Sequence, residues 1–152
     1  NRMLDKFIME RSSVIPIHIK INSPGGEIIP ALSIVSKIET AKDKGIYVIT
    51  EAEGFVDSGA FFIFIVGNWR TCSRYSRFML HQPEICDVSF NSTVKMERIS
   101  KDLSDIWNRI KNIIIENTVI TNEMLQEITS NDLDRYFWQE EARQYKIVDE
   151  VL

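Results

Sequence analysis

The chain has few of the residues that build metal sites, disulfide frameworks or membrane anchors. It contains two cysteines and two histidines among 152 residues. Cys72 and Cys86 form neither a C-x-x-C pair nor a Cys/His ligand pattern, so we expect reduced structural thiols and no metal or organic cofactor. The most apolar run, Phe61 to Val66, is far too short to cross a bilayer, and no segment resembles a cleavable signal peptide. We therefore expect a cytoplasmic protein with no membrane partner.

An excess of positive charge and low-complexity sequence are also missing. The formal net charge is -4, which argues against a nucleic-acid partner because such binding depends on clustered Lys and Arg. No Pro/Gly/Ser-rich tract could serve as a linker, so we expect one domain over residues 1–152. Met3, Leu4, Phe7 and Ile8 follow a helical spacing with almost no lead-in. Because this helical spacing starts almost at the first residue, we expect that the domain lacks an N-terminal segment.

Apolar residues follow strand and helix periods in alternation along the chain. Strands are predicted at 15–21, 46–50, 77–80 and 148–152, and helices at 28–38, 61–66 and 94–119, with two shorter helices after the long one. The first strand alternates isoleucine with polar residues, which predicts one buried face. Repeated strand and helix alternation predicts an α/β layered fold with a mainly parallel sheet.

A glycine-rich turn, Ser23-Pro24-Gly25-Gly26, lies between the first predicted strand and helix. Glycines leave backbone N–H groups uncovered, and the following helix adds the positive end of its dipole. Such a turn can stabilise an oxyanion, although Pro-Gly-Gly also makes a plain connector.

Ser58 and His81 are the candidate nucleophile and general base. Ser58 lies at a strand-to-helix corner directly before Gly59, whose N–H could be a second oxyanion donor; a serine there is also a common helix N-cap. His81 ends a strand just before Pro83, where side chains often face a cleft, but a structural histidine is equally consistent with that place. His18 lies mid-strand on the polar face, so we expect a surface role for it.

Several motifs together resemble the proteolytic subunit of the Clp protease, ClpP. They are Asn22-Ser-Pro-Gly-Gly26, Gly54-x-x-x-Ser58, Ser76-Arg-x-Met-x-His-Gln-Pro83, Asp134-Arg135 and the ending Glu141-Ala142 through Tyr145, Val148 and Asp149. The resemblance runs from about residue 15 to residue 152, in the same order and at nearly the same separations. The chain is similar to a divergent member of that family.

The resemblance implies a ClpP/crotonase-like fold of layered βαβ units with a protruding handle helix at 94–119, preceded by a handle strand and turn at 84–96. It implies a Ser58–His81–Asp134 triad in which Asp134 orients the imidazole. The residues Gly25, Gly26 and Gly59 would form the oxyanion hole. The expected activity is that of a serine endopeptidase acting on short peptides or unfolded proteins.

The resemblance also implies partners. The predicted long helix has isoleucines on more than one face, which indicates either internal packing or contact between subunits. By resemblance we expect a homo-oligomeric ring, a heptamer or stacked heptamers, and an ATP-driven unfoldase that delivers substrate.

Asp57 is the main departure from the family pattern, which usually has a small residue before the nucleophile. If Gly59 is matched to the family's glycine, Asp57 occupies the nucleophile position and the chain is a catalytically silent structural subunit of a mixed ring. If Gly54 and Gly67 are matched instead, Ser58 is the nucleophile, which is the alignment we favour. The Ser-Gly-Ala run also resembles signal peptide peptidase A, which uses a Ser-Lys dyad, and a crotonase-like enzyme that stabilises an acyl-CoA enolate is a third alternative.

Overall fold

The structure is a computed structural model and describes residues 15–84 and 92–152. The predicted helix at residues 3–8 lies outside the described residues. So does most of the predicted handle strand and turn at 84–96, although its last residues already belong to a helix that begins at Thr93.

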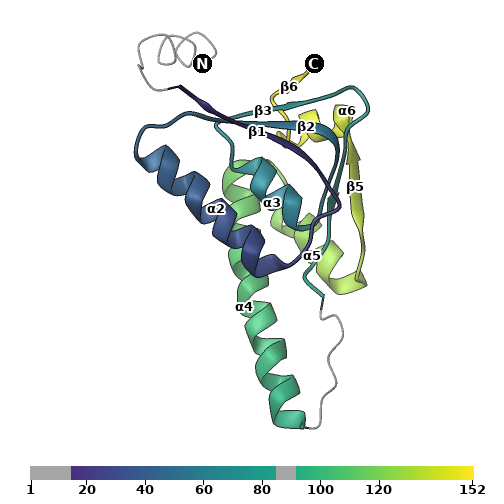
Figure 1. Ribbon diagram of the computed structural model, residues 1–152. Helices are drawn as coiled ribbons and strands as arrows, with labels where there is room; N and C mark the ends of the chain where they lie inside the picture. The colour runs from purple at the N-terminus through teal and green to yellow at the C-terminus, as the bar shows by residue number, and fades with distance from the viewer. Residues whose placement is uncertain (1–14, 85–91) are drawn as a thin grey trace.

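Strands and helices alternate along the described chain, and most strand pairs are parallel, which confirms the predicted fold class (Figure 1). In chain order the elements are β1 (Ile17–Ser23), α2 (Ile28–Asp43), β2 (Val48–Asp57), α3 (Gly59–Ile65), β3 (Trp69–Cys72), β4 (Arg77–Leu80), α4 (Thr93–Asn117), α5 (Asn122–Asn131), β5 (Arg135–Trp138), α6 (Gln139–Gln144) and β6 (Glu150–Val151).

The sheet is organised around its long strand β2. The strand order is β5-β4-β2-β3-β6, and β1 also pairs with β2. The first half of β2 pairs with β3 over Ile49–Ala52, and its second half pairs with β4 over Phe55–Asp57. Every pair is parallel except β4 with β5. The carboxyl ends of β1, β2 and β4 and the amino end of β5 therefore meet at one edge.

Helix α3 is the centre of the hydrophobic core. Phe61, Phe62, Phe64 and Ile65 are each at most 2% exposed. A helix that is apolar all round must be buried on every side, and α3 packs against β2, α2 and α4. Figure 1 shows α2, α3 and α4 on the same side of β1, β2 and β3. This packing fixes the amino end of α3, where Ser58 lies.

The long helix α4 protrudes from the body of the protein (Figure 1). Its buried residues are Trp107, Ile110 and Ile114, all in its second half. The first turns are exposed, including Val94 and Met96 at 60% and 53%. The predicted helix at 94–119 and its protrusion agree with the structure.

The structure corrects the bounds and the number of the predicted strands. The predicted strand at 46–50 and the segment leading to Ser58 are one strand, β2. Strands β3 and β5 were not predicted, and the predicted closing strand at 148–152 is only Glu150–Val151. The buried face predicted for the first strand holds only near its end, since Ile21 is 8% exposed but Ile15 and Ile17 are 87% and 42% exposed. In the described part of the chain β1 pairs with β2 alone, and Ile19 in its middle is only partly buried against the core.

Candidate active site

Four segments meet at the edge of the sheet where β1, β2 and β4 end. The Ser23–Gly26 turn follows β1, Ser58 follows β2, His81 follows β4, and Asp134 comes directly before β5. Asp134 reaches this edge because β5 runs antiparallel to β4, with Arg135 opposite Leu80. The topology thus collects residues from distant parts of the sequence.

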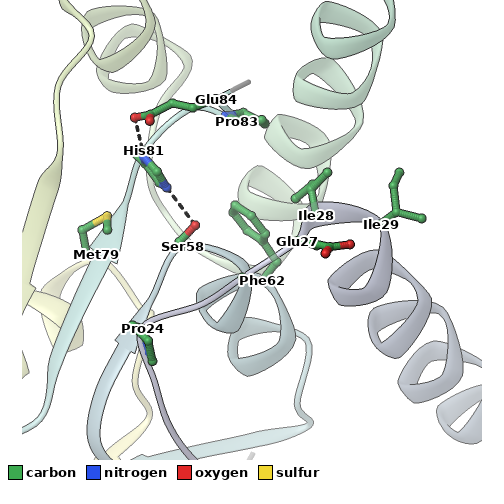
Figure 2. A pocket seen from close by; sticks show the side chains of 11 residues that line it. Pro24, Glu27, Ile28, Ile29, Ser58, Phe62, Met79, His81, Pro83 and Glu84 are labelled. Atoms are coloured by element: carbon green, nitrogen blue, oxygen red, sulfur yellow. Dashed lines mark hydrogen bonds and ion pairs between the residues drawn. The ribbon is translucent and has the colours of Figure 1, made fainter. Parts of the chain in front are cut away.

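Ser58 has a strained backbone between β2 and α3. Its φ is 53° and its ψ is -122°, a backbone conformation that residues other than glycine rarely adopt. The Ser58 N–H donates to the carbonyl of Met79 at 2.9 Å, which ties the corner to β4. Ser58 occupies the N-cap position of α3, but its hydroxyl makes no capping bond. The hydroxyl instead lies 2.7 Å from His81 Nε2 (Figure 2).

The glycine turn packs directly against this corner. A Cβ at Gly25 would lie 2.6 Å from the Asp57 carbonyl oxygen, 2.7 Å from Ser58 Cβ and 2.9 Å from the Gly59 nitrogen. The φ values of Gly25 and Gly26 are 98° and 151°, which glycine adopts without penalty. The Gly25 N–H donates to Ser23 Oγ at 3.2 Å. This engagement leaves the N–H groups of Gly26 and Gly59 as the better candidates for oxyanion donors.

The other ring nitrogen of His81 faces two carboxylates. Nδ1 lies 3.4 Å from Glu84 Oε1 and 3.6 Å from Asp134 Oδ1. Both separations exceed the usual length of a charge-assisted hydrogen bond, and this buried nitrogen makes no hydrogen bond to a described residue. The structure therefore brings Ser58 and His81 into contact and places Asp134 nearby. Sequence reasoning missed Glu84, for which the only signal was an acidic residue just after the His-Gln-Pro motif.

The Asp57 side chain does not contact His81 in the described structure. Its side chain is nearly buried and forms an ion pair with Arg77 of β4, while the neighbouring Ser58 hydroxyl points to His81. The Arg77 guanidinium also lies over the rings of Phe55, at 4.1 Å, and Tyr136, at 4.9 Å. The carboxylate beside Ser58 thus has its own cation.

A cleft of about 720 Å³ opens beside Ser58 and His81. Its walls are mainly apolar, and two acidic side chains, Glu27 and Glu84, stand at it (Figure 2). The apolar lining consists of Pro24, Ile28, Ile29, Phe62, Met79 and Pro83. An extended chain with an apolar side chain could therefore be held next to the serine hydroxyl.

The described ranges contain neither a metal-binding cluster nor a membrane-spanning helix. Within residues 15–84 and 92–152, no group of three His, Cys, Asp or Glu side chains is placed to hold a metal ion. None of the described helices is long and apolar enough to span a membrane. Cys72 is a buried free thiol, and burial raises its pKa to about 11; Cys86 lies outside the described residues. His18 is exposed and pairs with Glu51 at 2.8 Å, away from the cleft.

Fold and site together define a layered α/β protein with a serine–histidine pair at the carboxyl edge of its sheet. The chain belongs to the Clp protease family, whose model matches residues 6–152. This membership confirms the resemblance inferred from the motifs.

Curated relatives from two bacteria have names that agree with this membership. The chain is 33% identical over 141 residues to ATP-dependent Clp protease proteolytic subunit 3 of Streptomyces coelicolor, covering 90% of this chain and 60% of that protein. It is 29% identical over 139 residues to ATP-dependent Clp protease proteolytic subunit 2 of Prochlorococcus marinus, covering 90% of this chain and 66% of that protein. The chain thus spans somewhat less than two thirds of the length of these relatives.

Proposed function

We propose that this protein is a serine endopeptidase that hydrolyses peptide bonds of unfolded proteins or short peptides. The observation that carries the proposal is the 2.7 Å contact between Ser58 Oγ and His81 Nε2 at a strained corner facing an apolar cleft. A serine hydroxyl becomes nucleophilic when an adjacent base accepts its proton, and this contact has the required length.

In the proposed reaction, His81 Nε2 accepts the Ser58 proton as Oγ bonds to the peptide carbonyl carbon. The N–H groups of Gly26 and Gly59 stabilise the oxyanion, and Asp134 stabilises the imidazolium through Nδ1. His81 then donates the proton to the leaving amine, which breaks the C–N bond. A water molecule, deprotonated by His81, hydrolyses the acyl-enzyme and restores the Ser58 hydroxyl.

The proposed setting is a homo-oligomeric ring, a heptamer or stacked heptamers, served by an ATP-driven unfoldase in the cytoplasm. Family membership supports this assembly in general terms. The exposed apolar side chains at the protruding end of α4 support contact with another subunit.

A silent structural subunit is the second candidate function. It is favoured by the long separation between His81 Nδ1 and Asp134 and by the lack of a hydrogen bond from that nitrogen to any residue that the structure describes. Such a subunit would keep the fold and the ring contacts but would not activate Ser58.

Covalent labelling distinguishes the two candidates. Assembled full-length protein is treated with a fluorophosphonate, and the modified residue is mapped by mass spectrometry. We expect an adduct on Ser58 that disappears in Ser58→Ala and persists in Ser33→Ala, a matched loss of a hydroxyl on the exposed face of α2. Absence of an adduct in assembled protein would overturn the peptidase proposal in favour of the silent subunit.

A further inference from the structure

The face of the sheet that carries Asp57 also carries an aromatic cluster around Arg77. Strand register places Phe55 opposite Arg77 and Asp57 opposite Met79, and it places Tyr136 of β5 opposite Met79 on the other side. The Arg77 guanidinium contacts both the Phe55 and Tyr136 rings, at 4.1 and 4.9 Å from the ring centroids. A planar guanidinium stacks on aromatic faces in a way that an ammonium cannot.

The ion pair with Asp57 fixes Arg77 within this cluster. Asp57 is 4% exposed and its Oδ2 accepts a hydrogen bond from Arg77 Nη2. Separating a nearly buried carboxylate from its cation is unfavourable, so the guanidinium has little freedom to leave. The Tyr136 ring therefore packs against a guanidinium whose position is fixed.

Tyr136 connects this cluster to the candidate triad. Its hydroxyl donates to Asp134 Oδ2 at 3.2 Å, while the other oxygen of the same carboxylate, Oδ1, lies 3.6 Å from His81 Nδ1. The hydrogen bond with Asp134 and the charge of that carboxylate raise the pKa of Tyr136. The hydroxyl accordingly keeps its proton and stays a donor at neutral pH.

Asp134 needs such a restraint. Its side chain is 48% exposed and precedes β5, just after Asp132, which has a left-handed conformation with φ 51°. Glu84 Oε1 lies 3.4 Å from the same His81 nitrogen and competes for it. In the described part of the chain, the Tyr136 hydroxyl is the group that hydrogen-bonds the Asp134 side chain.

We propose that Tyr136 is a positioning residue of this site, which holds Asp134 toward His81 Nδ1 and is itself held by the Arg77–Asp57 pair. The inference rests on the proposed function, because positioning matters for catalysis only if Ser58 is the nucleophile. It also gives the unusual Asp57 a role. Asp57 fixes Arg77, which holds the Tyr136 ring, and Tyr136 in turn holds the proposed triad acid Asp134.

The kinetic test is the second-order rate constant for inactivation by a fluorophosphonate. Tyr136→Phe removes the hydroxyl but keeps the ring over Arg77, and we expect the rate constant to fall about 10- to 150-fold, the range for one hydrogen bond to a charged group. Tyr75→Phe, at a tyrosine that is 78% exposed, is the matched control and should not change the rate. In an Asp134→Ala background the effect of Tyr136→Phe should vanish, because the hydroxyl acts through Asp134. An equal loss in both backgrounds, or no loss, overturns the inference.

A spectroscopic test separates this inference from the proposed function. The chain has only two histidines, so ¹⁵N-histidine labelling with His18→Gln for assignment reports the tautomer of the His81 ring directly. We expect the Nδ1–H tautomer to dominate in the wild type and to decrease in Tyr136→Phe. A tautomer ratio that is the same in both proteins overturns the positioning role even if Ser58 reacts. A changed ratio in protein whose Ser58 does not react supports positioning while the peptidase proposal fails.

Discussion

The lack of a side chain at Gly25 sets how closely the Ser23–Gly26 turn approaches Ser58. A methyl group there would meet three backbone or Cβ atoms at under 3.0 Å, all belonging to residues 57–59. Backbone atoms at such a corner cannot yield as the end of a flexible side chain does. The turn can therefore lie this close to Ser58 only because Gly25 has a hydrogen atom where every other residue has a Cβ.

Gly25→Ala should accordingly reduce both stability and labelling. We expect a loss of about 3 kcal/mol in the free energy of unfolding, from left-handed strain together with overpacking, and at least a tenfold slower reaction of Ser58 with fluorophosphonate. Gly45→Ala is the matched control, because its φ is 77° but its Cβ would meet open space. That variant should lose only about 1 kcal/mol and label normally. Denaturant melts and labelling rates that are alike in the two variants would contradict this account.

Two carboxylates face His81 Nδ1, and substitutions can tell which of them supports the imidazolium. We expect Asp134→Asn to slow hydrolysis of a fluorogenic peptide about 10⁴-fold, as loss of a triad acid does when the geometry is kept. Glu84→Gln should slow it less than tenfold, because Glu84 is 59% exposed and lacks the support that Tyr136 gives Asp134. The reverse order in measured kcat would assign the triad acid to Glu84.

At the scale of elements, the sequence predicted what periodicity and turns encode. Strand β4 has the predicted bounds, Arg77–Leu80, and the helices follow the predicted order. Strands β3 and β5 were missed because they combine arginine, threonine or bulky aromatics with no clear alternation, whereas β4, which is equally short, has three consecutive apolar residues, Phe78, Met79 and Leu80. A strand of that length is defined by its neighbours more than by its own residues.

Local sequence patterns were also limited in what they could predict about the candidate site. Ser58 and His81 stand in recognisable motifs, so sequence reasoning could select them, and the structure places them in contact. Arg77 and Tyr136 could not be selected, because their positions depend on the pairing of β4 with β2 and β5. Glu84 lies only three residues after His81, and this local signal was missed. Register between strands that are distant in sequence is not written in local patterns.

At the scale of the whole molecule, α4 exposes apolar side chains that could be buried by contact with another subunit. Val94 and Met96 are both more than half exposed at its protruding end, where neighbouring turns are exposed as well. If rings form through this end, the helix is stabilised by another subunit.

Light scattering and hydrogen exchange would measure this assembly. We expect full-length protein at micromolar concentration to have several times the monomer mass, and the amides of 93–105 to exchange slowly in the assembled state. The double variant Val94→Asp/Met96→Asp should shift the mass toward the monomer and speed exchange in this segment, because buried charge at an apolar contact is unfavourable. Ser33→Asp on α2 controls for added charge. A monomeric mass for the wild type would contradict the proposed ring.

The antiparallel pairing of β4 with β5 also determines when a nascent chain could become reactive. The candidate nucleophile and base come from the first two thirds of the chain, whereas Asp134 reaches them only once residues 135–138 dock beside β4. Ribosomes add about 5 to 20 residues per second, so several seconds separate the synthesis of Ser58 from that of its candidate acid, Asp134. During translation, a chain of this topology would therefore carry Ser58 for several seconds before Asp134 could complete the proposed triad.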